Sequence, residues 1–309
     1  MSETFGRVAV LMGGQSAERE ISLLSGKAVL DALLANDIDA VGIDTGNDFF
    51  SAINQEKFDR AFIMLHGSFG EDGRVQAALD LMGIPYTGSG HMASALAMDK
   101  VRSKLIWMAQ GLPTPEFEIL YDSSDWQAVL DRLGPCFVKP VRDGSSLGIS
   151  KAETADELKQ AYELASKYDA AVMAESLIDG PEYSVPIVGN QVLPAIELRT
   201  KNAFYDYEAK YISDQTEYLC PCDLEEEADQ ELRGISGEAY QLIGCEGWGR
   251  VDLMRDKKGK FWLLELNTIP GMTSHSLVPM SAKVIGMDFK QLVLEILLNS
   301  MQEEGRSES

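Results

Sequence analysis

In the first part of the chain, short runs of apolar residues alternate with segments whose apolar residues recur at helical spacing. Short apolar runs at 7–12, 39–44 and 60–65 have the length and composition of buried strands. Between the first two runs, apolar residues recur at helical spacing: Ile21, Leu24, Ala28, Val29, Ala32 and Leu33. Ser16 suits the N-cap of this helix. Alternating strands and helices predict a parallel sheet covered by helices, which is an α/β arrangement.

The remaining pattern predicts a helix from 91 to 110, strands and helices in turn to about 183, and then mostly antiparallel strands. In the middle part, strands are expected at 136–141, 149–153 and 170–176, with a helix at 154–167. In the last part, strands are expected within 182–200 and at 247–255 and 260–268, with helices near 225–243 and 288–299. We therefore expect an α+β chain overall, with three domains at 1–97, 98–183 and 184–309.

Composition excludes several classes of function. The 309 residues carry a formal net charge of −22, which disfavours nucleic acid and anionic lipid as partners. We find no signal-like segment and no apolar run long enough to cross a membrane. Four cysteines and three histidines argue against a zinc site or a disulfide framework. A soluble, reduced, cytoplasmic protein is the expectation.

The segment 247–268 predicts a hairpin with its turn near Asp256–Gly259. Glu265 and Asn267 are two positions apart on one strand, so they share a face, and Asp252 should lie across from Glu265. Such an oxygen-rich set suits Mg²⁺ with phosphates completing the shell. A solvated strand face with scattered carboxylates is the alternative. The apolar residues expected on the opposite face are Val251, Leu253, Leu264 and Leu266.

Other polar residues each have a structural and a functional interpretation. Lys139 precedes a glycine-rich loop, 140–148, which could hold phosphate or could be a simple turn. Lys100 alone would be interpreted as an exposed helical lysine. Glu18 and His66 follow predicted strands, where ligands bind in parallel sheets, but they equally suit a helix start and a turn.

Eight stretches carry a recognisable pattern: GGQSAERE, LHGSFGEDG, PYTGSG, MDKVRSK, VKPVRDGSSLGISK, FYDYEAKYIS, GCEGWGRVDLM and LLELNTIPGMTSHSLVP. Together they resemble the D-alanine–D-alanine ligases of the ATP-grasp superfamily. Their order is that of the family, and they span nearly the whole chain. The resemblance implies an ATP-grasp fold, in which an N-terminal parallel α/β domain precedes two α+β subdomains that sandwich ATP.

The resemblance also implies the reaction and its ligands. ATP and two D-alanines would give D-alanyl-D-alanine, ADP and phosphate through an acyl phosphate, for peptidoglycan synthesis. ATP is then a co-substrate, with two Mg²⁺ or Mn²⁺ ions. The partners are small molecules, D-alanine and ATP, without nucleic acid or membrane, and a homodimer is compatible with the family.

Site residues follow by position in the matching motifs. The ATP site would comprise Lys100, Lys139, Gly144, Ser146, Glu175, Ser176, Leu177, Ile178 and Glu182. The metal ligands would be Asp252, Glu265 and Asn267. The catalytic group would comprise Glu18, Ser145, Tyr211, Arg250, Gly271 and Ser276, and the substrate-binding group His66, Lys210 and Leu277.

Within these groups, the resemblance gives separate roles. Glu18 would hold the first D-alanine's ammonium, with His66 near its carboxylate. Arg250 and the Gly271 N–H would stabilise the oxyanion. Ser276 and the Leu277 N–H would bind the second carboxylate. Glu18, Ser145 and Tyr211 would link a lid, near 200–215, to the site.

Three alternatives differ in a few positions. Another ATP-grasp ligase would keep the metal and lysine positions but change Glu18, Tyr211 and Ser276. A D-alanine–D-lactate ligase is expected to carry phenylalanine in place of Tyr211. A non-enzymatic α/β sensor would need no metal cluster.

Overall fold

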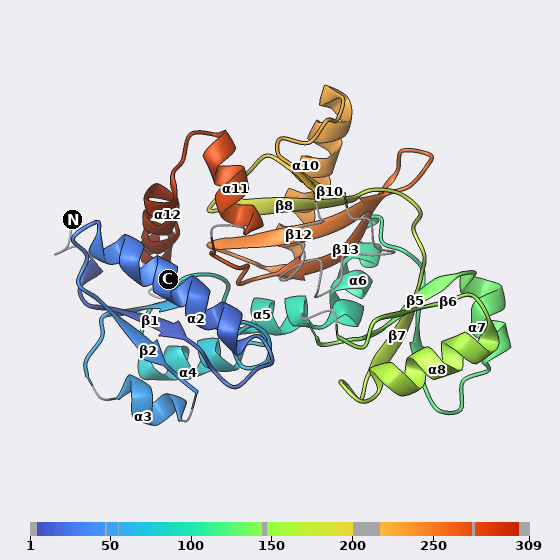
Figure 1. Ribbon diagram of the computed structural model, residues 1–309, viewed down its shortest axis with the longest axis horizontal. Coiled ribbons are helices and arrows are strands. Elements are labelled where there is room, and N and C mark those ends of the chain that lie inside the picture. The colour runs from blue at the N-terminus through green and yellow to red at the C-terminus, as the bar shows by residue number, and fades with distance from the viewer. Residues whose placement is uncertain are drawn as a thin grey trace.

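The computed structural model describes residues 5–46, 48–54, 56–143, 147–199, 217–273 and 276–302. The described chain forms three sheets with helices packed around them (Figure 1). Among the described residues, no helix is both long and apolar enough to cross a lipid bilayer.

The first sheet is parallel, in the order β2-β1-β3, as the alternating pattern predicted. Its strands are β1 (Val8–Met12), β2 (Ala40–Asp44) and β3 (Arg60–Ile63), and its helices are α2 (Arg19–Leu34), α3 (Phe49–Ile53) and α4 (Arg74–Met82). All of β1 is buried because the strand lies between two neighbours under α2. The predicted N-cap is two residues early: Glu18 occupies that position, and the Ser16 hydroxyl accepts a hydrogen bond from the Glu18 N–H.

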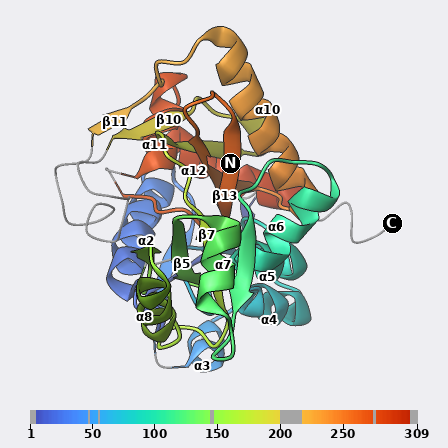
Figure 2. The same ribbon diagram turned by 90° about the vertical axis from the view of Figure 1, so that its right-hand side faces the viewer.

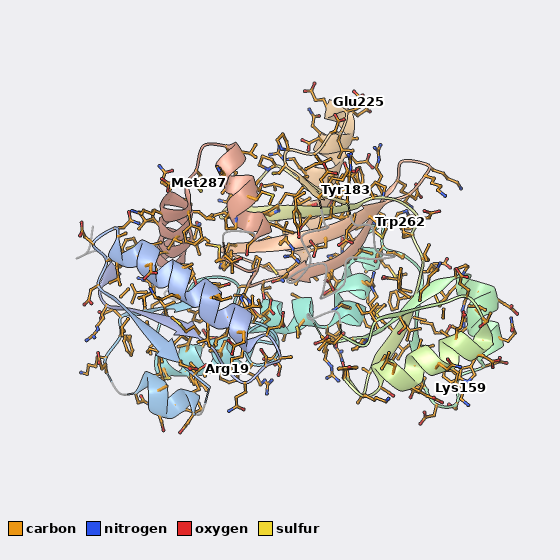
Figure 3. All side chains as sticks on the ribbon, in the orientation of Figure 1. Arg19, Lys159, Tyr183, Glu225, Trp262 and Met287 are labelled. Carbon is orange, nitrogen blue, oxygen red and sulfur yellow. The ribbon has the colours of Figure 1, made fainter. Side chains whose placement is uncertain are left out.

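The second sheet is antiparallel, in the order β4-β7-β5-β6. Its elements are β4 (Phe117–Leu120), α7 (Trp126–Leu133), β5 (Cys136–Pro140), β6 (Ser150–Ala152), α8 (Ala155–Ala165) and β7 (Val172–Ser176). The two helices pack together over one core of the sheet (Figure 2). Thr154 and Glu157 form a capping box at the start of α8, and Lys159 lies on its exposed side (Figure 3).

The third sheet is antiparallel and has the order β11-β10-β8-β12-β13, with β9 paired to β8. Its strands are β8 (Glu182–Val188), β9 (Gln191–Val192), β10 (Ile196–Arg199), β11 (Glu217–Leu219), β12 (Trp248–Arg255) and β13 (Phe261–Asn267). Helix α10 (Glu226–Ile243) packs on this sheet and on the helices preceding the second sheet. Glu225, at the α10 N-cap, lies at the outer tip of the molecule (Figure 3).

The helix predicted from 91 to 110 is two helices, α5 (His91–Met98) and α6 (Lys100–Ala109). Asp99 breaks the helix with an extended backbone, and its carboxylate caps α6 by accepting from the Arg102 N–H at 3.0 Å. The Lys100 N–H donates to the Val141 carbonyl at 3.2 Å, so it does not continue the hydrogen-bond ladder of α5. Both helices lie between the first and second sheets, beneath the third (Figure 1).

The chain returns to the first sheet at its end. Helix α11 (Leu277–Val284) leads to α12 (Phe289–Gln302), which packs beside α2 (Figure 1). Four α12 side chains are completely buried in the core of the first sheet: Leu292, Val293, Ile296 and Leu297. Although α12 lies in the third predicted domain by sequence, its apolar face therefore belongs to the first core.

Candidate active site

The β12–β13 hairpin brings the predicted metal ligands together. Asp252 pairs directly with Glu265, and Arg250 pairs with Asn267. Directly paired residues of an antiparallel ladder point to the same face. The four polar side chains of the two strands therefore share one face of the third sheet.

The opposite face of the hairpin forms the core, with one correction to the prediction. Val251, Leu253 and Leu266 are buried, as expected, but Leu264 is only half-buried, and Leu263 takes its place in the core. The ladder shifts between Asp252 and Leu253, where Leu264 is skipped in the pairing. A β-bulge of this kind reverses the alternation of side chains, which strict period-two reasoning does not anticipate.

Both hairpin carboxylates are held by cations. Asp252 accepts two hydrogen bonds from the Arg250 guanidinium at 2.7 and 2.9 Å and one from the Ser184 hydroxyl at 2.7 Å. Glu265 forms an ion pair with Lys100 at 3.1 Å. The two cations, Arg250 and Lys100, therefore balance the charge of the two carboxylates on this face.

The donor set suits a magnesium ion that takes few protein ligands. Over the described residues, no three His, Cys, Asp or Glu side chains cluster closely enough to hold a metal by themselves. Asp252, Glu265 and Asn267 offer two carboxylates and an amide oxygen, although the Asn267 amide oxygen already accepts from the Ile269 N–H at 3.1 Å. Mg²⁺ is commonly held by one or two carboxylates together with substrate phosphates and water.

Lys100 is not the exposed lysine that its sequence context suggested. It is 6% exposed, and its ammonium donates to the Asp143 carbonyl at 2.6 Å, at the start of the glycine-rich loop. Burial opposes its charged form, but the nearby carboxylates together, with Glu265 the strongest, outweigh burial and raise the pKa of Lys100. A permanent positive charge therefore lies between the hairpin and the loop.

A second buried charge cluster lies at the base of the predicted ATP cleft. Glu175, at the end of β7, accepts from Lys139 at 2.5 Å and pairs with Lys104. Burial opposes ionisation of Glu175, but the two lysines outweigh it and lower the pKa of this carboxyl. Burial also lowers the pKa of Lys104 to about 8, against the attraction of Glu175.

The rest of the predicted adenine–ribose cleft is the crossover from β7 to β8. The Ser176 hydroxyl donates to the Leu133 carbonyl at 2.9 Å, and the Leu177 N–H donates to the Pro135 carbonyl at 2.8 Å. Ile178 and Glu182 follow, both half-buried. This connection joins the second sheet to the third, so the predicted ATP residues line the junction of two sheets.

Glu18 lies where the first sheet meets the hairpin. It is 5% exposed at the α2 N-cap, and the same cavity is lined by Glu71, Lys100, Glu265 and Asn267. The structure thus brings a predicted ammonium-binding carboxylate together with predicted phosphate and metal ligands. Glu18 and the two hairpin residues, Glu265 and Asn267, are more than 240 positions apart in the sequence.

Glu71 is a member of this cavity that the sequence analysis did not identify. Its carboxylate accepts from the Gly67 N–H at 2.5 Å. Burial, followed by repulsion from Glu18, raises the pKa of Glu71 to about 8. A buried carboxyl that is largely protonated at neutral pH, next to an acidic partner, is typical of a functional site. In the sequence, Glu71 lies within the matching stretch LHGSFGEDG, where it was given no role.

The loop after β13 carries the predicted oxyanion and acceptor residues. Ser276 occupies the N-cap position of α11, but its hydroxyl makes no cap hydrogen bond to the helix and accepts from the Thr273 N–H at 2.9 Å. A Cβ on Gly271 would lie 3.0 Å from the Ser276 Oγ, so the glycine lets the two residues approach closely. Leu277 is the first residue of α11, whose N–H groups are oriented for an anion.

His66 lies beside the same loop. Its Nδ1 is 2.9 Å from the Ile269 carbonyl, and burial lowers its pKa to about 4. The whole of the predicted lid, 200–215, lies outside the described ranges. So do five predicted site residues: Gly144, Ser145, Ser146, Lys210 and Tyr211.

Sequence comparisons agree with this geometry. The family description "D-ala D-ala ligase C-terminus" matches residues 106–298, and "D-ala D-ala ligase N-terminus" matches residues 48–89. The chain is 53% identical over 304 residues to a D-alanine–D-alanine ligase of Ectopseudomonas mendocina, covering 98% of this chain and 97% of the relative. It is 55% identical over 297 residues to that of Saccharophagus degradans, covering 96% and 95%.

The chain belongs to the D-alanine–D-alanine ligase family. Among solved structures, a Bacillus anthracis D-alanine–D-alanine ligase complexed with ATP superposes with a TM-score of 0.87 at 32% identity, covering 98% of this chain and 99% of that one. The VanG D-Ala:D-Ser ligase of Enterococcus faecalis gives 0.84 at 30% identity, covering 96% and 99%. The predicted family and ATP-grasp fold are confirmed.

Proposed function

We propose that this chain uses ATP to join two molecules of D-alanine into D-alanyl-D-alanine, releasing ADP and phosphate, as a step toward peptidoglycan. One observation carries the proposal. The cavity between the first and third sheets is lined by an ammonium-binding candidate, Glu18, by the charged Lys100, and by Glu265 and Asn267. A carboxylate for an amino acid, placed beside groups for phosphate and metal, is what an ATP-dependent amino-acid ligase requires.

The first half-reaction places the γ-phosphate next to the first D-alanine carboxylate. Lys100 and Lys139 neutralise phosphate oxygens, with Gly144 and Ser146 of the intervening loop expected to add N–H donors. Glu175 to Glu182, at the sheet junction, line the adenine–ribose cleft. The D-alanine carboxylate attacks the γ-phosphate, and the bond to ADP breaks, giving an acyl phosphate.

Two magnesium or manganese ions are expected at Asp252, Glu265 and Asn267, where they would supply charge neutralisation at the phosphates. The residues themselves place two carboxylates and an amide on one face of the hairpin. Arg250 orients Asp252 through its paired hydrogen bonds.

The second half-reaction joins the amine of the second D-alanine to the acyl carbon. Phosphate leaves as the amide forms through a tetrahedral oxyanion. The Gly271 N–H and Arg250 would stabilise this oxyanion, and Ser276 with the Leu277 N–H would bind the second carboxylate. Glu18 holds the first ammonium, while Ser145, Lys210 and Tyr211 are expected to complete the closed site on the strength of the resemblance.

The test is phosphate release from Mg-ATP with D-alanine, compared with L-alanine, D-serine and D-lactate. We expect release that depends on D-alanine and gives the dipeptide as the main product when all acceptors are supplied. Absence of D-alanine-dependent release would overturn the activity, and a dominant D-serine or D-lactate product would overturn the acceptor assignment.

A further inference from the structure

A buried serine on α2, the helix that covers the first sheet, binds the loop that follows β13. Ser25 lies on α2 and has no exposed surface, and the Met272 N–H donates to its hydroxyl oxygen at 3.1 Å. Met272 is also fully buried. The loop of the hairpin is therefore attached by its backbone to a helix of a different sheet.

His66 forms a second attachment at Ile269, three residues earlier in the same loop. Its Nδ1 is 2.9 Å from the Ile269 carbonyl, and its Nε2 is 3.4 Å from the Ser25 hydroxyl. A carbonyl oxygen can only accept, so Nδ1 carries the proton. The low pKa of this buried ring leaves it neutral, so Nε2 is an acceptor.

These roles give one consistent direction of hydrogen bonding. The Met272 N–H donates to Ser25, the Ser25 O–H donates to His66 Nε2, and His66 Nδ1–H donates to the Ile269 carbonyl. Both ring nitrogens and the serine hydroxyl are thereby engaged. His66 in this arrangement offers a substrate carboxylate neither a charge nor an uncommitted N–H.

Building on the proposed function, we propose that Ser25 and His66 are positioning residues that aim the Gly271 N–H at the reacting carbon. Gly271 lies between the two attachment points, Ile269 and Met272, and packs closely against Ser276. Fixing the backbone on both sides leaves the intervening peptide little freedom. A misplacement of about 1 Å in such a group can cost on the order of a hundredfold in rate.

Ser25→Ala tests the proposal, and Ser22→Ala is its matched control. Ser22 lies one turn earlier on α2 and is equally buried. Its hydroxyl accepts from the Gly13 N–H at 2.8 Å and donates to the Met64 carbonyl at 2.5 Å. Both partners directly follow strands of the first sheet, so Ser22 makes no contact with the loop after β13 through these bonds. The two variants lose comparable hydrogen bonds, but only Ser25→Ala releases the loop.

The measurements are kcat, KM for ATP, Tm, and inhibition by a phosphinate dipeptide that mimics the tetrahedral intermediate. We expect both variants to lower Tm similarly. Ser25→Ala should lower kcat by roughly tenfold to a hundredfold and weaken phosphinate inhibition equally, with KM for ATP within about twofold. Equal kcat losses in Ser22→Ala and Ser25→Ala, or an unchanged kcat in Ser25→Ala, would overturn the positioning role.

A second pair keeps the test decisive if Ser25→Ala does not fold. His66→Asn and His66→Leu fill nearly the same space, but only asparagine can donate to the Ile269 carbonyl. We expect kcat of His66→Asn to be about tenfold higher than kcat of His66→Leu. Equal kcat values for the two variants would overturn the proposal. If the unmutated protein shows no D-alanine-dependent turnover, the proposed function has failed. Loop positioning is then tested by phosphinate binding alone, which should be weaker in Ser25→Ala than in Ser22→Ala.

Discussion

The buried carboxyl of Glu71 shows how the fold sets the charge of one residue. Its pKa is about 8 in the folded chain, against an ordinary value of 4.5, because of burial and of Glu18. At pH values between about 4.5 and 8, the Glu71 carboxyl is protonated in the folded state and ionised in the unfolded state. The stability linked to this proton is complete below about pH 4.5 and decreases as the pH rises toward 8.

Replacing Glu71 by glutamine should remove this dependence. The amide cannot ionise, and its oxygen can still accept from the Gly67 N–H. We expect Glu71→Gln to become more stable relative to the unmutated protein at pH 8 than at pH 5, as measured by urea unfolding at both values. A stability difference that is the same at both pH values would show that the carboxyl is not protonated in the folded state.

Glu265 should matter for turnover much more than for stability. Glu265→Gln removes a charged ligand from the proposed metal site and an ion pair with Lys100. We expect kcat to fall by on the order of a hundredfold or more, with a smaller effect on Tm, because Glu265 is partly exposed and Lys100 keeps its bond to the Asp143 carbonyl. Glu118→Gln, which removes an ion pair with Arg132 on the second sheet, is the control. Near-normal turnover of Glu265→Gln at saturating Mg²⁺ would contradict the assignment.

At the scale of elements, the break between α5 and α6 puts Lys100 at the start of α6, where its ammonium contacts the Asp143 carbonyl and Glu265. Asp99→Ala removes the α6 cap, and Asp125→Ala removes the same kind of cap from α7, where its carboxylate accepts from the Ala128 N–H at 3.1 Å. Each should cost about 1 kcal/mol of unfolding free energy.

Only the first of these two cap variants should affect nucleotide use. Since Lys100 directly follows the Asp99 cap, we expect Asp99→Ala to raise KM for ATP about fivefold, equivalent to about 1 kcal/mol. The Asp125→Ala value should not change. Steady-state kinetics on both variants measures KM for ATP. Equal KM values in the two variants would show that the Asp99 cap does not position Lys100 for the proposed phosphate site.

The sequence predicted those elements whose signals are local. The start of α8 near Thr154 and the turn of the β12–β13 hairpin were both predicted from neighbouring residues. The break at Asp99 was not, because it depends on the Lys100 N–H pairing with Val141, about forty residues away. The bulge at Leu264 likewise depends on the partner strand.

The same distinction applies to the site. Asp252, Glu265 and Asn267 could be grouped because one hairpin contains them. Ser25, Glu71 and Lys104 could not, since each gains its role from contacts with residues distant in the sequence. Ser25, for example, meets Met272, and no spacing in the sequence connects the two.

At the scale of the whole molecule, buried polar contacts connect parts of the chain that are far apart in the sequence. Arg60 at the start of β3 donates to the Ser300 carbonyl of α12 at 2.9 Å. Lys104 has no exposed surface and donates to the Thr114 hydroxyl at 2.7 Å and the Leu263 carbonyl at 3.2 Å, besides its ion pair with Glu175. This one ammonium therefore connects α6 and the second sheet to the hairpin of the third.

Removing Lys104 should loosen that junction and leave Glu175 with one lysine in place of two. Breaking a buried ion pair costs about 3–5 kcal/mol, so we expect Lys104→Met to lower the unfolding free energy by that amount. Lys257→Met is the control, because Lys257 and its partner Asp179 are mostly exposed and such pairs contribute about 0–1 kcal/mol.

The double variant Lys104→Met with Glu175→Gln separates charge from packing. Once the carboxylate is neutral, it no longer requires two cations, so the double variant should recover part of the stability lost by Lys104→Met alone. Urea unfolding of the two single variants and the double variant gives the coupling between the residues. Additive losses would mean that Lys104 acts on the junction through its contacts with Thr114 and Leu263, and that the charge of Glu175 is balanced by Lys139 alone.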